Sequence, residues 1–267
     1  MQDIGRVAVL GAGNIGLAIA EGIASSWDFG MTGESVVITR RNTSFTCEEE
    51  ERFDCFTDNR KAVSQAKIVI IAPRPDQVDD LLNEIADVLE GQLLISVVSG
   101  LSIERIQKLT GRGPVVRAML NIAVQVSQSM ICVAFSEEAL AYAATVAAIF
   151  SPLGEVLMIS EERVLEATVF CGSEIAFALR SLDTHVRCCE RAGFTRAEAM
   201  LITTQVTKGA LALFEKSQGN PESDIARVST KGGCTVAMLE ELEQGGFRSL
   251  IQKALETCLQ KARKLYS

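Results

Sequence analysis

The chain has 267 residues, of which 48% are hydrophobic and 22% charged, a balance typical of a globular protein with a filled core. Its net charge of −8 argues against binding to nucleic acid or an anionic membrane, because either polyanion would be repelled over much of the surface. The longest uncharged apolar stretch, residues 139–154, is too short to span a bilayer, and no N-terminal signal pattern is visible, so we expect a cytoplasmic protein.

Short apolar runs rich in β-formers alternate with helical patterns over the first 160 residues. This alternation predicts repeated βα units and a mainly parallel sheet, and so an α/β fold. The runs are almost continuously apolar, so both faces of the sheet should be covered. The expected strands are residues 6–10, 35–39, 67–72, 92–98, 114–119, 129–135 and 155–159.

Only helical patterns follow residue 159. Ser160 is expected to cap a helix that runs toward Ala192 and ends at Gly193. Thr195 and Glu198 form a capping box for a second helix, which runs to residue 216. A short helix should begin at residues 220–221, with Asn220 as its cap, and two more should cover residues 234–244 and 247–266.

These C-terminal helices carry apolar residues on more than one face. A few helices of this size bury apolar surface poorly alone, so we expect a homodimer or larger homo-oligomer built through residues 161–267. The alternative is that they pack back onto the sheet of the same chain.

The single histidine and the eight cysteines, which contain no C-x-x-C pair, make a metal site unexpected. The adjacent Cys188 and Cys189 could be redox-active, but two small apolar side chains on a helix are the favoured interpretation.

Three glycines follow the first expected strand at the spacing G-x-G-x-x-G, in the stretch "GAGNIG". In such a turn the first glycine makes the bend, the second lets the backbone approach a pyrophosphate, and the third lets helix and strand pack closely. The helix N-terminus then faces the anion. We therefore expect a dinucleotide to bind at Gly11, Gly13, Asn14, Ile15 and Gly16, although purely structural glycines are an alternative.

The end of the second expected strand bears on which dinucleotide binds. It supplies Thr39, Arg40 and Arg41, with no carboxylate before Glu48. A guanidinium suits phosphate geometry, whereas an NAD site usually has an acid at this place. The pattern favours NADP(H) over NAD(H). Residues 1–160 are accordingly predicted to form a Rossmann-type, doubly wound NADP(H)-binding domain, and residues 161–267 an all-helical domain for substrate binding and oligomerisation.

Several segments together resemble the pyrroline-5-carboxylate reductase family, over nearly the whole chain. They are "IIAPRPDQV", "ISVVSGLSIERI", "VVRAMLN", "EATVFCGSEIAFAL" and, most specifically, "NPESDIARVSTKGGCTVAMLEELEQGGFR". The last is similar to the family pattern H-P-x-x-L-x-x-x-V-x-S-P-G-G-T-T followed by L-E-x-x-G-x-R. Members of this family reduce the C=N bond of a cyclic imino acid with a nicotinamide cofactor and make proline.

The resemblance implies the remaining site residues. It places the substrate carboxylate on the loop that holds Thr230, Gly232, Gly233 and Cys234, and the imine nitrogen near the hydroxyl of Thr235. The residues implied to contact the cofactor are Ala72, Pro73 and Arg74 on the sheet side, and Ser99, Gly100 and Asn121 near the nicotinamide.

The chain departs from the family pattern at Lys231, Cys234, Leu120 and Glu174. Glu174 stands where the family has a glycine. Two alternatives to proline formation therefore stay open: reduction of another cyclic or acyclic imino acid, and a paralogue that binds dinucleotide without catalysis.

Overall fold

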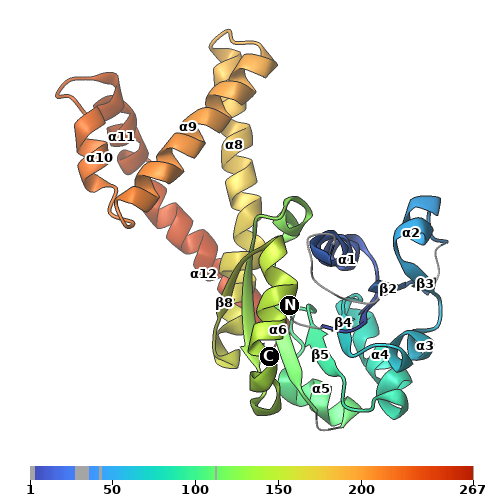
Figure 1. Cartoon of the computed structure of the whole chain (residues 1–267). Coiled ribbons are helices and arrows are strands. Elements are labelled where there is room, and N and C mark those ends of the chain that lie inside the picture. The colour runs from blue at the N-terminus through green and yellow to red at the C-terminus, as the bar shows by residue number, and fades with distance from the viewer. Residues whose placement is uncertain (1–3, 28–35, 42–43, 112, 267) are drawn as a thin grey trace. The chain divides into compact units, whose positions relative to one another are not determined.

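The computed structural model describes residues 4–27, 36–41, 44–111 and 113–266 (Figure 1). The chain forms two compact units, which are described separately below. The first comprises Met1–Ser173 and Leu259–Ser267, and the second comprises Glu174–Cys258.

The first unit is built on one mainly parallel sheet, as the sequence predicted. In the described residues it has eight strands in the order β3-β2-β1-β4-β5-β6-β7-β8. Neighbouring strands are parallel except for the antiparallel pair β6 and β7. The strands are β1 (Val7–Leu10), β2 (Val36–Thr39), β3 (Asp54–Phe56), β4 (Ile68–Ile71), β5 (Leu93–Ser96), β6 (Val115–Met119), β7 (Ser129–Phe135) and β8 (Gly154–Met158).

All seven expected strands are present, and β3 is the one that the sequence analysis missed. Helices connect most of the strands and lie on both faces of the sheet (Figure 1). They are α1 (Asn14–Trp27), α2 (Cys47–Arg52), α3 (Asn59–Ser64), α4 (Val78–Ile85), α5 (Ile103–Thr110) and α6 (Ala143–Phe150).

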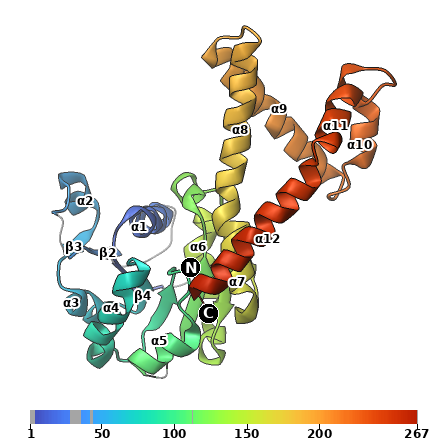
Figure 2. The same cartoon turned by 180° about the vertical axis from the view of Figure 1, so that it is seen from behind.

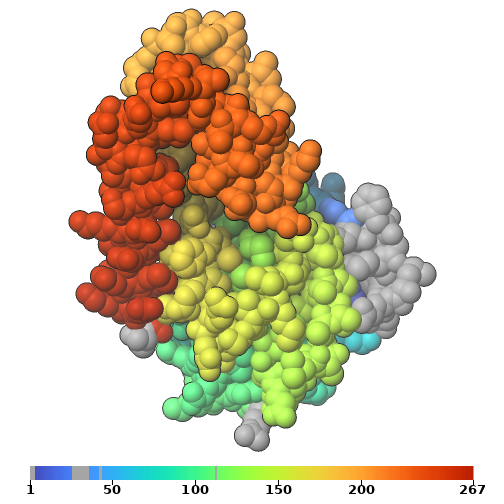
Figure 3. Space-filling view, turned by 90° about the vertical axis from the view of Figure 1, so that its left-hand side faces the viewer, coloured from blue at the N-terminus to red at the C-terminus, as the bar shows by residue number. Residues whose placement is uncertain are grey.

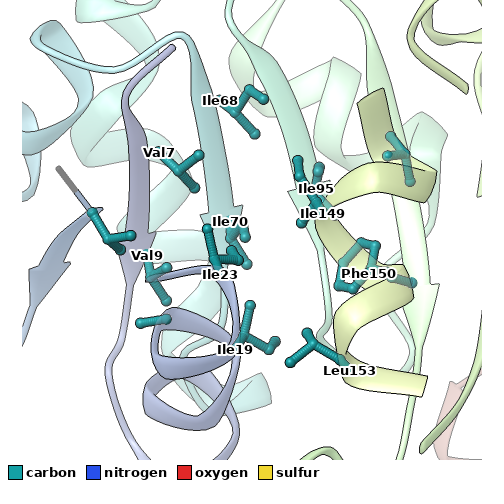
Figure 4. Close-up of a cluster of buried hydrophobic side chains, with 14 of the residues drawn as sticks. Val7, Val9, Ile19, Ile23, Ile68, Ile70, Ile95, Ile149, Phe150 and Leu153 are labelled. Atoms are coloured by element: carbon teal, nitrogen blue, oxygen red, sulfur yellow. The ribbon is translucent and has the colours of Figure 1, made fainter. Parts of the chain in front are cut away.

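Each face of the sheet carries its own apolar cluster. On one face, Ile19 and Ile23 of α1 and Ile149 and Phe150 of α6 pack with strand side chains such as Ile70, and all five are fully buried (Figure 4). On the other face, side chains of α3, α4 and α5 cover the alternate residues of the same strands. Full burial of each large apolar side chain contributes about 1.5–3 kcal/mol, so this two-sided covering fixes the sheet and the loops at its edge.

The segment after β8 does not form the single regular α-helix expected from residue 161. A 3₁₀ turn (Glu161–Arg163) is followed by α7 (Val164–Ala167), a π-helical turn (Thr168–Ser173) and then α8 (Glu174–Arg191). Ser160 makes no capping hydrogen bond with its side chain.

Contacts with the sheet hold this segment in place. Val164 and Ala167 pack in a cluster with Met119 and Cys132. The carboxylate of Glu161 accepts hydrogen bonds from the backbone N–H of Ile103 (2.7 Å) and from the guanidinium of Arg117 (3.0 Å). Residues 161–173 therefore belong to the first unit, and the compact units divide further along the chain than the expected domain boundary.

The second unit consists of α8, α9 (Arg196–Lys216), α10 (Glu222–Val228), α11 (Cys234–Gln244) and most of α12 (Phe247–Tyr266), seen from behind in Figure 2. The predicted capping box of Thr195 and Glu198 at the start of α9 is confirmed. The expected cap at Asn220 is wrong: Pro221 occupies the cap position of α10, without a capping hydrogen bond from a side chain.

This helical unit buries few of its own apolar side chains. Val186, Ala199 and Thr203 are its buried residues within α8 and α9, and α10 and α11 have none. Figure 3 shows an opening between helices of the unit, coloured yellow to red. Large apolar side chains that remain exposed include Phe177, Leu179, Met200, Leu201, Val206, Leu211, Phe214, Val228, Met238, Phe247 and Leu250. Exposed apolar surface of this extent is typical of an interaction site.

Candidate active site

A cavity of about 670 Å³ opens where β1, β2 and β4 end. The chain order of the strands reverses at β1, which has β2 on one side and β4 on the other. Open α/β sheets bind their ligands at such a switch point. The cavity is lined by Gly11, Ala12, Gly13, Asn14, Leu17, Thr39, Arg40, Arg41, Ser44, Asn59, Ala72, Pro73, Arg74, Gln77 and Leu81.

The three glycines of the turn differ in what surrounds them. Gly11 has φ of +90°, and a Cβ there would lie 2.8 Å from the backbone nitrogen of Pro73. A Cβ on Gly16 would overlap the carbonyl oxygen of Gly11, so only glycine allows this close approach. A Cβ on Gly13 would have no atom within 4 Å, because this residue faces the open cavity. These surroundings fit a tight turn at Gly11 and close packing at Gly16, and the approach of a pyrophosphate to Gly13 stays a prediction.

The start of α1 presents backbone N–H groups at the cavity. The first α-helical hydrogen bond runs from the N–H of Leu17 to the carbonyl of Gly13, at 2.8 Å. The N–H groups of Asn14, Ile15 and Gly16 precede it and can receive an anion, with the positive end of the helix dipole behind them. Ile15 and Gly16 are not among the residues that line the cavity. Any contact that they make with a bound anion is therefore through their backbone N–H groups.

A hydrogen-bonded network fixes the end of β2. The buried hydroxyl of Thr39 donates to Oδ1 of Asn59 (2.7 Å) and accepts from the N–H of Gly11 (3.3 Å). The amide of Asn59 donates to both carboxylate oxygens of Glu84, at 3.1 and 3.2 Å. Glu84 also accepts from Arg41, at 2.6 Å. The sequence analysis missed Asn59 and Glu84, because both residues reach the end of β2 only through contacts between segments that are distant in the sequence.

The sequence predicts that Arg40 is free to bind a phosphate, but in the structure its guanidinium is already bound to other groups of the chain. Its Nε donates to the carbonyl of Ala12 at 2.6 Å, and both terminal nitrogens donate to the carboxylate of Glu49, one of them at 2.8 Å. The hydrogen bond from Arg40 lowers the pKa of Glu49 below its ordinary value. No acid directly follows β2, but Glu49 of α2 lies against Arg40 and accepts its hydrogen bonds.

The residues implied to lie near a nicotinamide do not line this cavity. The amide nitrogen of Asn121 donates to the carbonyl of Cys171 in the π-helical turn (2.7 Å), and its Oδ1 accepts from the N–H of Ala123 (2.9 Å). Ser99 and Gly100 form a turn after β5, and the ring of Tyr266 lies directly over Gly100, which has φ of +77°. The structure thus gives Asn121 an anchoring role, and its contact with a cofactor stays a prediction.

The backbone conformation of the loop before α11 explains why this loop contains two glycines. Gly232 has φ of +75°, in the left-handed region that favours glycine. Gly233 is the N-cap of α11 and donates its N–H to the carbonyl of Thr230 at 2.9 Å. A Cβ on Gly233 would lie 2.7 Å from the hydroxyl oxygen of Thr230. No side chain caps α11, so the N–H groups of its first turn remain available to an anion.

The predicted substrate residues lie together at this helix start. Cys234 and Thr235 are the first two residues of α11, and Lys231 is exposed on the loop before them. All belong to the second unit, whereas the cofactor candidates belong to the first. Leu120, one of the departures from the family pattern, is buried in the core of the first unit, which gives its apolar character a structural reason.

The described residues lack two further features. No helix among them is long and apolar enough to cross a membrane. No three or more of their His, Cys, Asp and Glu side chains are grouped so as to hold a metal ion.

Two family models match the chain. Residues 161–265 match the model described as pyrroline-5-carboxylate reductase dimerisation, which supports self-association. Residues 6–100 match the model described as NADP oxidoreductase, coenzyme F420-dependent. The first of these models starts at the expected domain boundary, although the compact units divide at Ser173.

Similar proteins and structures agree with these models. Pyrroline-5-carboxylate reductase 1 of Dictyostelium discoideum is 40% identical over 98% of this chain, which spans half the length of that relative. Pyrroline-5-carboxylate reductase 2 of the same organism is 33% identical, and the match covers 97% of this chain and 92% of the relative. The Plasmodium falciparum pyrroline carboxylate reductase with NADP bound has the same fold, with a TM-score of 0.89, 22% identity and 98% of both chains covered.

The matches cover both the sheet domain and the helical segment of this chain. The predicted fold class and the predicted family are therefore both confirmed. The chain belongs to the pyrroline-5-carboxylate reductase family.

Proposed function

We propose that this protein reduces the C=N bond of 1-pyrroline-5-carboxylate with NADPH and forms L-proline. The observation that carries the proposal is the cavity at the strand switch point, lined by Gly11, Gly13 and three arginines, in a chain that belongs to this family. The protein is then an NAD(P)H-dependent oxidoreductase that acts on a CH–NH bond.

The residues of the cavity fit a dinucleotide phosphate. Gly13 leaves open space beside the start of α1, where the orphan N–H groups can bind the pyrophosphate. Arg41 and Arg74 line the cavity and are exposed, so they can contact a 2′-phosphate, whereas an acid would repel it. When bound, NADPH supplies the hydride for the imine carbon. We accordingly infer NADP(H) as the cofactor, with NAD(H) less favoured.

The residues proposed to bind the substrate lie in the loop before α11 and at the start of that helix. Here the left-handed turn at Gly232 leads into α11, whose uncapped first-turn N–H groups, including those of Cys234 and Thr235, can bind the substrate carboxylate, and the positive end of the α11 dipole stabilises it. The hydroxyl of Thr235 donates to the imine nitrogen and relays a proton from water. Holding the carboxylate and the C=N bond in one orientation accounts for much of the rate enhancement, because the reacting atoms then need no further ordering.

The exposed apolar side chains of α8 to α12 support assembly of a homodimer through residues 161–267. Burial of these side chains against a second copy would supply the core that the helical unit lacks. We also place the enzyme in the cytoplasm, with a small imino acid as substrate and neither nucleic acid nor membrane as partner.

The test is turnover of synthetic 1-pyrroline-5-carboxylate by the purified full chain, followed by the loss of NADPH absorbance, with NADH in parallel. Formation of L-proline at micromolar enzyme concentration supports the proposal. Thr235→Val is the matched variant, because it keeps the shape of the side chain and removes the hydroxyl. Binding of NADP⁺ without turnover of this substrate would refute the proposed reaction.

Lys231 and Cys234 favour one alternative, in which the same chemistry acts on another imino acid. Both lie in the predicted carboxylate loop and differ from the family pattern. A panel of larger cyclic imines and acyclic imines separates this alternative from a paralogue that binds dinucleotide without catalysis, since only the former turns over a member of the panel.

A further inference from the structure

We propose that Glu49 lowers the selectivity of this protein for NADP(H) over NAD(H) by neutralising Arg40 at the edge of the cavity. The inference rests on the proposed function only in that a dinucleotide binds in this cavity. It does not depend on which imine is reduced.

Arginine side chains supply the positive charge around the cavity. Among the described residues, three arginines line it: Arg40, Arg41 and Arg74. Arg40 pairs with Glu49 and Arg41 pairs with Glu84, whereas Arg74 forms no ion pair within the described part of the chain. Two of the three positive charges that could attract a 2′-phosphate are therefore offset by a carboxylate.

The two paired arginines are not equivalent. The side chain of Arg40 is 17% exposed and that of Glu49 is 10% exposed, so this pair is shielded from water and salt. Arg41 is 46% exposed and uses one terminal nitrogen for Glu84, which leaves its other donors accessible. Arg41 can turn toward an incoming phosphate more readily than Arg40.

Glu49 is also fixed in place by its own helix. It is the third residue of α2, and its Oε2 accepts from the backbone N–H of Thr46 at 2.8 Å, in a capping box with the Thr46 hydroxyl. The same oxygen accepts from Arg40, and the other oxygen accepts from the second terminal nitrogen. A 2′-phosphate would have to displace this carboxylate or bind an arginine whose charge is already neutralised.

The substitution Glu49→Gln isolates the charge. Glutamine can also complete a capping box, and its amide oxygen can still accept from Arg40, so α2 keeps its start. The positive charge of Arg40, already oriented by the carbonyl of Ala12, then faces the cavity without an anion beside it. We expect the affinity for NADP⁺ to rise on the order of fivefold to tenfold, with the affinity for NAD⁺ changed less than about twofold.

The experiment is calorimetric titration of the 267-residue protein with NADP⁺ and NAD⁺, without imine substrate, for wild type and Glu49→Gln. Titrations with 2′,5′-ADP and 5′-ADP isolate the contribution of the 2′-phosphate. Glu48→Gln is the matched control, because it removes the same charge from an exposed neighbour on α2 and should leave the ratio of affinities unchanged.

A second pair of variants keeps the proposal falsifiable if Glu49→Gln does not fold. Arg40→Gln should weaken NADP⁺ binding by less than about threefold, because the charge it removes is already neutralised, and Arg41→Gln should weaken it on the order of tenfold.

An unchanged or lower affinity ratio in Glu49→Gln, or a larger loss in Arg40→Gln than in Arg41→Gln, would overturn the proposal. If the ratio rises but no imine is reduced, the proposed reaction fails while this inference stands. If the ratio is unchanged while the wild type makes proline, only this inference fails. Wild-type protein that binds neither dinucleotide would overturn both.

Discussion

Two glycines in the turn after β1 should affect different properties of the protein. Gly16 should matter for the stability of the fold and Gly13 for cofactor binding, and an alanine substitution at each tests this expectation. A Cβ on Gly16 would meet the carbonyl oxygen of Gly11, which is backbone and can only move by distorting the turn. A Cβ on Gly13 would meet no protein atom within 4 Å, and Gly13 does not have a positive φ. The same methyl group is therefore costly to the fold at one position and harmless at the other.

The expected magnitudes follow from this geometry. Overpacking by one methyl group in Gly16→Ala should cost about 1–3 kcal/mol, which lowers the Tm by roughly 3–9 °C. Gly13→Ala should change the free energy of unfolding by less than about 1 kcal/mol, since a poorer helix cap is offset by lower entropy of the unfolded chain. In the bound state, however, the new methyl group occupies the space through which a pyrophosphate reaches the start of α1, and NADP⁺ affinity should fall at least about tenfold, or ~1.4 kcal/mol.

Thermal unfolding followed by circular dichroism measures the first quantity, and calorimetric titration with NADP⁺ measures the second. Gly13→Ala should unfold like wild type and bind NADP⁺ poorly, whereas Gly16→Ala should be impaired in both. The reasoning is refuted if Gly13→Ala loses as much thermal stability as Gly16→Ala, or if it binds NADP⁺ with wild-type affinity.

Three further outcomes are expected. Thr235→Val should lower kcat on the order of a hundredfold with little change in the KM for NADPH, as steady-state kinetics would show; an unchanged kcat removes the hydroxyl from proton transfer. The pKa of Glu49 is lowered by its bond to Arg40, so its contribution to stability is present above its ordinary pKa of 4.5 and lost as the pH falls through its lowered folded-state pKa. The difference in Tm between wild type and Glu49→Gln should therefore shrink below pH 4.5, and a difference that grows on acidification would contradict this. Val206→Glu, at a side chain that is 66% exposed in the single chain, should yield monomers by light scattering at micromolar concentration without unfolding the first unit, and a wild type that is itself monomeric would refute self-association.

The parts of the fold that local chemistry determines were predictable from the sequence. Most strands of the sheet are short, nearly continuous apolar runs, and the turn after β1 is marked by the local spacing of its glycines. The capping box of Thr195 and Glu198 is likewise a contact between residues three apart. Strand β3 was missed because it has only three residues and begins with an aspartate, so no apolar run marks it.

The features that were not predictable depend on contacts between distant segments. The capping pattern of Thr46 and Glu49 is visible in the sequence, but the bond from Glu49 to Arg40 exists only once α2 returns to the end of β2. The π-helical turn before α8 accepts a hydrogen bond from Asn121, which lies far from it in sequence. Both contacts alter the predicted site: one occupies Arg40, and the other uses the amide of Asn121.

The most direct test of the central claim is reduction of 1-pyrroline-5-carboxylate with NADPH that carries deuterium at the transferred position. Reduction of this C=N bond adds the hydride to the ring carbon that does not bear the carboxylate. The account predicts L-proline with one deuterium on Cδ, detected by NMR, and a rate that falls in Thr235→Val. Absence of labelled proline from protein that binds NADP⁺, or deuterium on Cα instead, would contradict it.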